Sequence, residues 1–217
     1  MSAPVHSAAV IDLLALLAYG ELQAFDQMAA DARLAPDLHR RAVLSEMAAA
    51  EIVTYRRLAE RLAQLGAEPE PAMRPFVPAL EQFHDQTAPK DWLEALTKAY
   101  VGDGIADDFY HEVALHLDSP DRELVLDVLH DTRYADFAKA EIREAIAADP
   151  KVANRLSMWA RRLVGEGLSQ AQRVAVERPS LAMLLVGTVS DEDGIGALFK
   201  RLTTGHTARM AAVGLNN

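Results

Sequence analysis

Residues 11–28 read IDLLALLAYGELQAFDQM, an apolar stretch with a carboxylate in the middle of its apolar face. At about 3.6 residues per turn, one stripe of this predicted helix carries Ile11, Leu14, Ala18, Glu21, Phe25 and Met28. Glu21 is therefore predicted to point inward, where a globular helix normally keeps only core residues. A lone ionised carboxylate is costly to bury, so Glu21 requires a cation, a hydrogen-bonding partner or a metal ion.

Three further predicted helices each repeat this pattern of one acid on an apolar stripe. They run over residues 37–65, 91–117 and 121–148, and their inward acids are Glu51, Asp103 and Asp131 respectively. The helical phase does not exclude Asp107 in the third helix or Asp136 in the fourth. A single acid on an apolar stripe often pairs with arginine at the edge of a core. One such acid in each of four helices favours a shared acidic cluster.

Proline positions indicate how these helices are connected. Ala35-Pro36-Asp37 and Ser119-Pro120-Asp121 each end one helix and start the next, because proline disfavours helix at the preceding residue and aspartate favours a helix N-terminus. The connection over residues 66–90 contains Pro69, Pro71, Pro75, Pro78 and Pro89. These prolines leave room for only a short helical piece at 79–84. We therefore predict two helical hairpins joined by one long crossover.

Two more helices are predicted at the C-terminus. One follows Asp149-Pro150, carries Glu166 on its apolar stripe and ends at Arg178-Pro179. The other opens at Ser190-Asp191-Glu192-Asp193, which has the form of a capping box. The predicted fold class is therefore all-α: a four-helix bundle with one long crossover and two additional C-terminal helices. Residues 1–217 are expected to form a single domain.

Composition narrows the range of functions. Without cysteine the chain has neither a disulfide framework nor a thiolate metal site, so a transition metal would need carboxylates and the seven histidines. The net charge of −10 argues against a broad nucleic-acid surface, although a contact with tRNA stays open. No uncharged run reaches the roughly 20 residues that cross a bilayer, and no lysine or arginine precedes the apolar start. We therefore expect a cytoplasmic protein without a membrane partner.

One inward acid on each of four antiparallel helices, with one long crossover, is the arrangement by which ferritin-like bundles hold two iron or manganese ions. The chain resembles that superfamily and, within it, the ferritin-like proteins related to the tRNA hydroxylase that acts on methylthio-isopentenyl-adenosine. The resemblance covers residues 8–212 and rests on Ala18-Tyr19-Gly20-Glu21, Ala49-Ala50-Glu51, AYVGDGIA at 99–106 and Asp131-Thr132. It implies a ferritin-like bundle in which iron or manganese is held by Glu21, Glu51, Asp103 and Asp131.

The sequence departs from the superfamily pattern at the imidazole ligands. In that pattern a histidine follows three positions after the second and fourth acids, where this chain has Thr54 and Tyr134. A threonine hydroxyl is a weak neutral ligand and a tyrosinate suits ferric iron, so the affinity for two metals is expected to fall sharply. The further side chains that the pattern leaves open as ligands are Asp107, Tyr134, Asp136 and Glu166.

Two functional interpretations are open. The missing histidines favour a ferritin-like scaffold or interaction protein, a homodimer, whose degenerate site holds one metal ion or is empty. The resemblance favours a non-haem di-iron or di-manganese oxygenase or hydroxylase, in which the metals activate oxygen. Neither interpretation identifies a small-molecule substrate.

Overall fold

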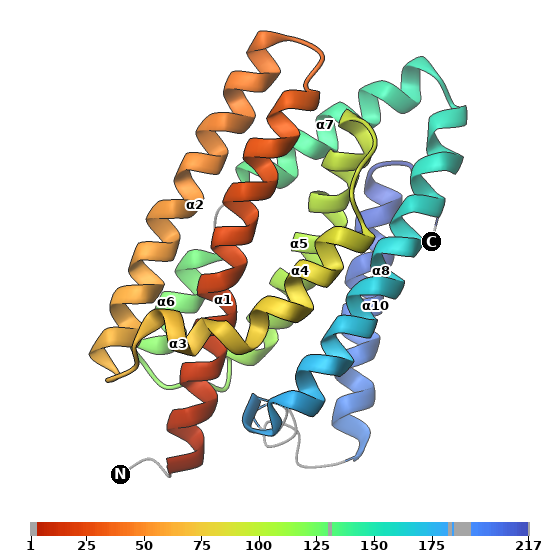
Figure 1. Cartoon of the computed structure of the whole chain (residues 1–217). Coiled ribbons are helices and arrows are strands. Elements are labelled where there is room, and N and C mark those ends of the chain that lie inside the picture. Colours follow the sequence, from red (N-terminus) through yellow and green to blue (C-terminus); the bar gives the residue numbers. More distant parts are fainter. Residues whose placement is uncertain (1–3, 130–131, 182–183, 185–191, 217) are drawn as a thin grey trace.

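The computed structural model describes residues 4–129, 132–181, 184 and 192–216, and every regular element in these residues is a helix (Figure 1). The predicted all-α class is therefore confirmed. The first hairpin consists of α1 (Pro4–Asp31) and α2 (Leu38–Gln64), joined through the 3₁₀ turn η1 (Ala32–Leu34). As predicted, Asp37 caps α2, because its Oδ1 accepts a hydrogen bond of 2.8 Å from the backbone N–H of Arg40.

The connection between α2 and the second hairpin is the long crossover that the prolines predict. It contains α3 (Pro69–Met73), the 3₁₀ turn η2 (Arg74–Phe76) and α4 (Val77–Gln86), so it is more helical than expected. Figure 1 shows it running across the bundle from the lower end of α2 towards the start of the next hairpin. Phe76 and Ala79 are buried in the core, which holds the crossover against the bundle.

The second hairpin differs from the prediction in one respect. Its first helix is α5 (Trp92–Ala114). The predicted continuous helix over 121–148 was wrong, because the structure divides it into α6 (Asp121–Val128) and α7 (Arg133–Ala148). Thr132, at the start of α7, makes no side-chain capping hydrogen bond, and its hydroxyl donates to the Asp136 carboxylate instead.

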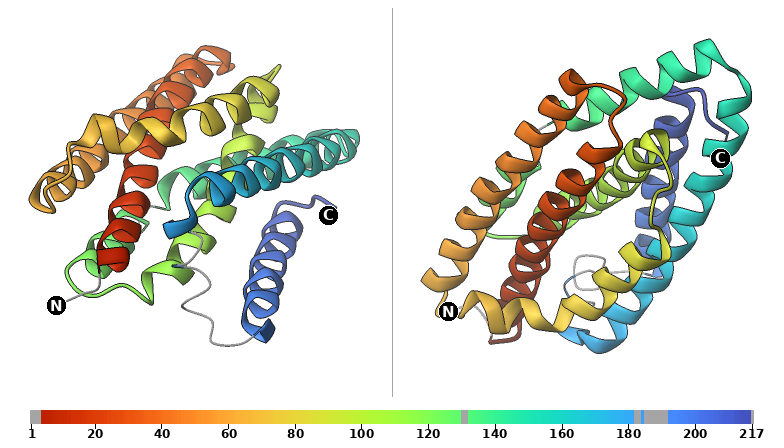
Figure 2. Two further views of the ribbon diagram at one scale, coloured as in Figure 1. Left: turned by 60° about the horizontal axis from the view of Figure 1, so that its bottom comes forward. Right: turned by 45° about the horizontal axis from the view of Figure 1, so that its top comes forward.

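Two C-terminal helices follow, as predicted. They are α8 (Lys151–Glu177) and α10 (Glu192–Ala212), and both pack against α5. α8 ends immediately before Arg178-Pro179, whereas the predicted capping box at 190–193 lies only partly within the described residues. The two views in Figure 2 show α5 in the middle of the bundle, with α1 and α2 on one side and α8 and α10 on the other, while α4 packs against α8. α5 is therefore the central helix.

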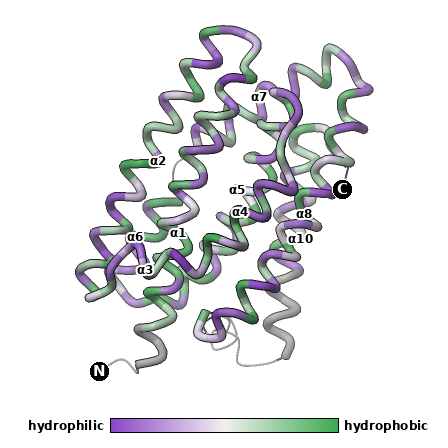
Figure 3. The backbone as a smooth tube through the Cα atoms, viewed as in Figure 1, coloured by the Kyte–Doolittle hydropathy of each residue, from purple (hydrophilic) through white to green (hydrophobic). Residues whose placement is uncertain are grey.

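The core consists of two apolar clusters that use different segments of the same helices. The first cluster takes buried residues from the N-terminal half of α1, and the second takes them from its C-terminal end. Between the clusters, residues 20–27 of α1, 49–57 of α2 and 102–112 of α5 contribute no buried residue to either. Figure 3 shows hydrophilic and hydrophobic segments alternating along these helices. We refer to these three ranges as the middle layer.

α1 has the length and the apolar composition of a membrane span. The stretch Ala8–Leu34 could cross a bilayer by these two criteria, but 50% of the most apolar window is buried inside the bundle. Leu13 and Leu14, for example, have no exposed surface. The same composition therefore serves as the core-facing side of a bundle helix.

Candidate carboxylate site

The middle layer carries acids from three helices. Glu21 lies on α1, Glu51 on α2, and Asp103 and Asp107 lie on α5. Glu21 precedes Pro36 by 15 positions and Glu51 follows it by 15. Because successive residues of an α-helix rise by equal steps, an antiparallel hairpin that turns at Pro36 brings these two acids to the same level.

The carboxyl groups of Glu21 and Glu51 face each other across the first hairpin, close enough for a hydrogen bond between them. Two carboxyl groups form such a bond only when one of them carries a proton. Burial, the hydrogen bond with Glu51, and the negative charges of Glu51, Asp103 and Asp107 raise the pKa of Glu21 from 4.5 to about 10. The pair therefore keeps a proton at neutral pH when no other cation is nearby.

Asp103 and Asp107 lie one turn apart on α5, so they share a helix face. Desolvation by the surrounding protein, followed by the charges of Asp107 and Glu51, raises the pKa of Asp103 well above its ordinary value. Desolvation also raises the pKa of Asp107 to about 7. Both residues are nevertheless exposed to solvent, as Asp136 is. Exposure and a raised pKa are compatible when water reaches a side chain that protein surrounds on most sides. Water in such a place solvates a charge poorly.

The two positions at which the superfamily pattern has histidine carry side chains of different chemistry. Tyr134, on α7, is 9% exposed, and its hydroxyl is buried without a hydrogen-bond partner in the described part of the chain. Burial and the charges of Asp103, Asp31 and Glu51 raise the pKa of Tyr134 well above its ordinary value. A neutral phenol therefore lies near the carboxylates. Thr54, half-buried on α2, offers only a hydroxyl.

The other predicted ligands are not brought into this cluster. Asp131 lies outside the described residues. Asp136 is exposed on α7 and accepts a hydrogen bond of 3.3 Å from the hydroxyl of Thr132, and Glu166 is half-buried on α8. Neither is among the groups that shift the pKa of Glu21 or of the two α5 aspartates. For Asp136 the reason is that α7 starts anew at its own N-terminus and does not continue the phase of α6.

A second group of interior polar side chains was not anticipated from the sequence. Lys98, on α5, is 4% exposed, and Asp31, at the end of α1, is 3% exposed. Gln27 links them, because its Nε2 donates to Asp31 Oδ1 at 3.0 Å and its Oε1 accepts from Lys98 Nζ at 3.3 Å. A stripe analysis misses Lys98 because the N-terminal half of α5 is buried on most sides. The apolar composition of WLEALTKAYV at 92–101 is the signal that could have revealed this.

The carboxylates of the described residues do not form a closed metal-binding group. Within the ranges that the structure describes, no three histidine, aspartate or glutamate side chains are placed to hold one metal ion together. Glu21 and Glu51 face each other across the first hairpin. A metal ion would therefore have to compete with a proton on Glu21 and draw acids of α1, α2 and α5 together.

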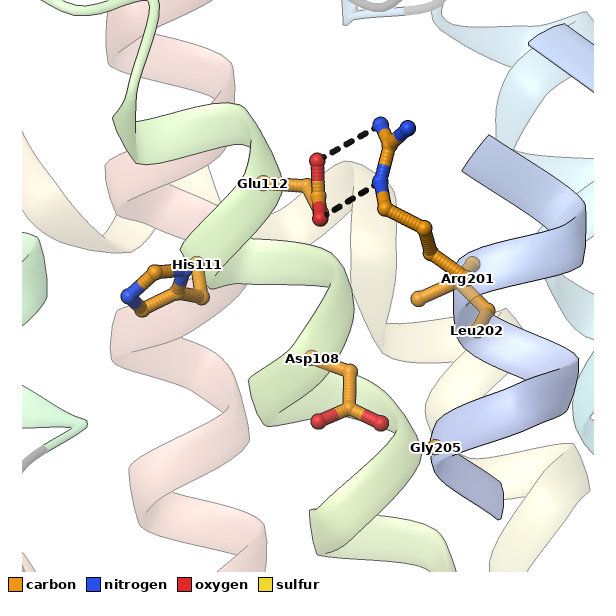
Figure 4. A pocket seen from close by; sticks show the side chains of 6 residues that line it. All are labelled: Asp108, His111, Glu112, Arg201, Leu202 and Gly205. Carbon is orange, nitrogen blue, oxygen red and sulfur yellow. Dashed lines mark hydrogen bonds and ion pairs between the residues drawn. The ribbon is translucent and has the colours of Figure 1, made fainter. Parts of the chain in front are cut away.

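A separate hollow lies between α5 and α10 (Figure 4). It has a volume of ≈ 160 Å³ and is lined by Asp108, His111, Glu112, Arg201, Leu202 and Gly205. Arg201 donates to both carboxylate oxygens of Glu112 at 2.8 Å. Arg209 Nη2 donates to Asp108 Oδ2 at 2.7 Å and to the backbone carbonyl of Gly104 at 2.7 Å. These ion pairs hold α10 against the central helix beside the carboxylate cluster.

Comparison with known proteins adds information on the family and the fold. A family model described as a ferritin-like domain of actinomycetes matches residues 4–188. No curated protein matches the chain. Among solved structures, "Protein 19 with aldehyde deformylating oxidase activity from Synechococcus" superposes with a TM-score of 0.75 at 17% sequence identity, covering 99% of this chain and 93% of that chain. At this identity the likeness concerns the fold. The more specific likeness to the tRNA hydroxylase stays a prediction.

Proposed function

Because the chain belongs to the ferritin-like family of actinomycetes, we propose that it is a ferritin-like scaffold whose interior carboxylates bind a single metal ion in exchange for a proton. The observation that carries this proposal is the close approach of the half-buried Glu21 and Glu51 across the first hairpin, with the pKa of Glu21 raised to about 10. Such a raised pKa marks a position of uncompensated negative charge. A divalent cation competes with the proton on Glu21 for the same oxygens.

The available donors suit one hard cation better than a pair of irons. The carboxylates of Glu21, Glu51, Asp103 and Asp107 offer only oxygen, which suits manganese and magnesium and also binds iron. At the two imidazole positions of the superfamily pattern the chain has Thr54 and Tyr134, and a neutral phenol is a poor replacement for an imidazole nitrogen. A bound ion would connect α1, α2 and α5 and stabilise the folded chain, because it binds only the folded state.

Metal binding to the chelator-treated protein tests this function. The protein is titrated with Mn²⁺ at neutral pH, and anaerobically with Fe²⁺, in two buffers that differ in ionisation enthalpy. We expect one ion per chain and the release of about one proton. Glu21→Gln should weaken this binding strongly, because it removes a carboxylate, whereas Glu60→Gln, at an exposed position of α2, should bind as the wild type does. A wild type that binds no ion, or equal binding by Glu21→Gln, refutes the proposal.

A two-metal oxygenase is the second candidate function. It is supported by the fold shared with the Synechococcus protein that has aldehyde deformylating oxidase activity. In this case, the chain would bind two irons and would reduce oxygen. Two ferrous ions per chain, together with oxygen uptake when the loaded protein meets air-saturated buffer, would favour this function over the scaffold.

A further inference from the structure

The middle stretch of the central helix lacks the usual sources of helix stability. Residues 102–108 of α5 read GDGIADD, and glycine and aspartate are among the less favourable residues in a helix interior. None of the seven is buried, whereas both ends of α5 reach into the core. The stretch is nevertheless helical and carries Asp103 and Asp107. Because helices in proteins gain most of their stability from packing, contacts with a neighbouring element must support it.

α10 supplies such contacts through a regular pairing with α5. The paired positions advance by four residues along α5 and go back by four along α10, as expected for two antiparallel helices that meet along one face each. The pairs are Gly104 with Arg209, Asp108 with Gly205 and Glu112 with Arg201. Figure 4 shows the second and third pairs between the two helices.

The first two pairs interlock. Arg209 Nη2 donates to the backbone carbonyl of Gly104 and to Asp108 Oδ2, each at 2.7 Å. A Cβ at Gly104 would collide with the side chain of Arg209, and a Cβ at Gly205 would lie 2.6 Å from Asp108 Oδ2. Each glycine therefore makes room for the charged side chain of the opposite helix. We refer to these four residues as the clasp.

Arg209 is firmly placed for this role, whereas the third pair is not. The side chain of Arg209 is 15% exposed, and its backbone carbonyl accepts a hydrogen bond of 3.1 Å from the hydroxyl of the buried Tyr100. The side chain of Arg201 is 54% exposed, and its partner Glu112 lies beyond residues 102–108. Arg209 therefore supports the weak stretch, and Arg201 offers a comparison on the same helix.

We propose that Arg209 is a positioning residue that keeps residues 102–108 helical, so that the docking of α10 fixes the places of Asp103 and Asp107. Its guanidinium acts at two points one helical turn apart, on the carbonyl of Gly104 and on the carboxylate of Asp108. Without it the stretch retains only its own weak helix preference. This inference goes beyond the proposed function, because it holds with or without a bound metal ion.

Hydrogen–deuterium exchange of the full-length, chelator-treated protein, resolved by mass spectrometry of its peptides, tests this inference. Arg209→Met keeps an unbranched side chain but removes the guanidinium, and Arg201→Met is the matched control. A further variant combines Arg209→Met with Gly102→Ala. Alanine favours a helix more than glycine does, and beyond its own stretch of helix a Cβ at position 102 would meet no described atom within 4 Å. Arg209→Gln replaces the methionine variant if that protein does not fold.

In Arg209→Met the amides of residues 102–108 should exchange roughly tenfold or more faster than in the wild type, because two bonds of a charged group are lost. Arg201→Met should change this exchange by less than about twofold, since its ion pair is exposed. Adding Gly102→Ala to Arg209→Met should slow it again by about fivefold, because the helix preference is restored locally.

Three results would overturn the inference. The first is unchanged exchange of residues 102–108 in Arg209→Met. The second is an acceleration of the same size in residues 9–18 of α1, which would show a general loss of stability. The third is a double variant that exchanges as fast as Arg209→Met, because the effect of the arginine would then not depend on the helical state of this stretch.

Discussion

Replacing Glu21 by glutamine should make the stability of the metal-free protein less dependent on pH. In the folded protein the pKa of Glu21 is raised to about 10, whereas its ordinary value is 4.5. Between these two values the folded protein holds one proton more than the unfolded chain. The stability contributed by the protonated Glu21 is therefore fully present below pH 4.5. It is lost progressively as the pH rises from 4.5 towards about 10.

The expected size of the effect follows from proton linkage. One group in this window costs the wild type about 1.4 kcal/mol of unfolding free energy for each pH unit. Between about pH 5.5 and about pH 7.5, the full effect is roughly 2.7 kcal/mol. We expect about 1–3 kcal/mol, because Glu21 interacts with other acids and its titration spreads over a wider pH range than that of an isolated group. Glutamine does not ionise, and its amide still donates a hydrogen bond to Glu51, so the variant should avoid most of this loss.

Urea unfolding of the chelator-treated proteins, followed by far-UV circular dichroism at these two pH values, measures the effect. We compare the unfolding free energy of Glu21→Gln with that of the wild type. The value of the variant minus that of the wild type should be larger at the higher pH. Glu60→Gln, at an exposed position of α2, controls for the loss of one negative charge. If the difference between variant and wild type is the same at both pH values, the pKa of Glu21 is not raised in the metal-free protein.

Three further predictions concern neighbouring side chains. Thr54→His combined with Tyr134→His should raise the binding of ferrous or manganous ion without changing the helical content. The reason is that imidazoles would then follow the acids at the superfamily spacing. If metal analysis finds no gain, this placement of the ligands is contradicted. Tyr134→Phe should leave the stability of the metal-free protein unchanged or raise it by up to about 1 kcal/mol. The substitution removes a buried hydroxyl that has no partner among the described residues. A clear loss of unfolding free energy in urea would contradict this prediction. Gly205→Ala should cost about 1–3 kcal/mol, because its Cβ would lie 2.6 Å from Asp108 Oδ2; an unchanged urea midpoint would show that α10 has room to shift.

Much of the architecture could be predicted because it depends on signals that act within a few residues. Asp37 caps α2 as its position after Pro36 predicts. The prolines of residues 66–90 predict a crossover, and the structure has one. The level of the first two acids also follows from the sequence, since Glu21 and Glu51 are equidistant from the turn.

The predictions were weaker where one helix was assumed to continue. A stripe drawn over 121–148 made Asp131 the inward acid and left Asp136 as an alternative, but α6 ends at Val128 and α7 begins at Arg133. Periodicity shows which residues share one side of a continuous helix. It therefore cannot be extended across a break between two helices. Asp136 is therefore exposed and hydrogen-bonded to Thr132 in place of joining the cluster.

Local sequence signals were sufficient to predict a helical bundle with one acid on the apolar stripe of each of its first two helices. The raised pKa of Glu21 beside Glu51, the burial of Lys98 and the hydroxyl of Tyr134 without a partner among the described residues all depend on how the helices pack. Helical phase and capping are set by residues a few positions apart. The protonation and pairing of a buried group depend on charges that other helices bring within reach, and these distances exist only once the bundle has folded.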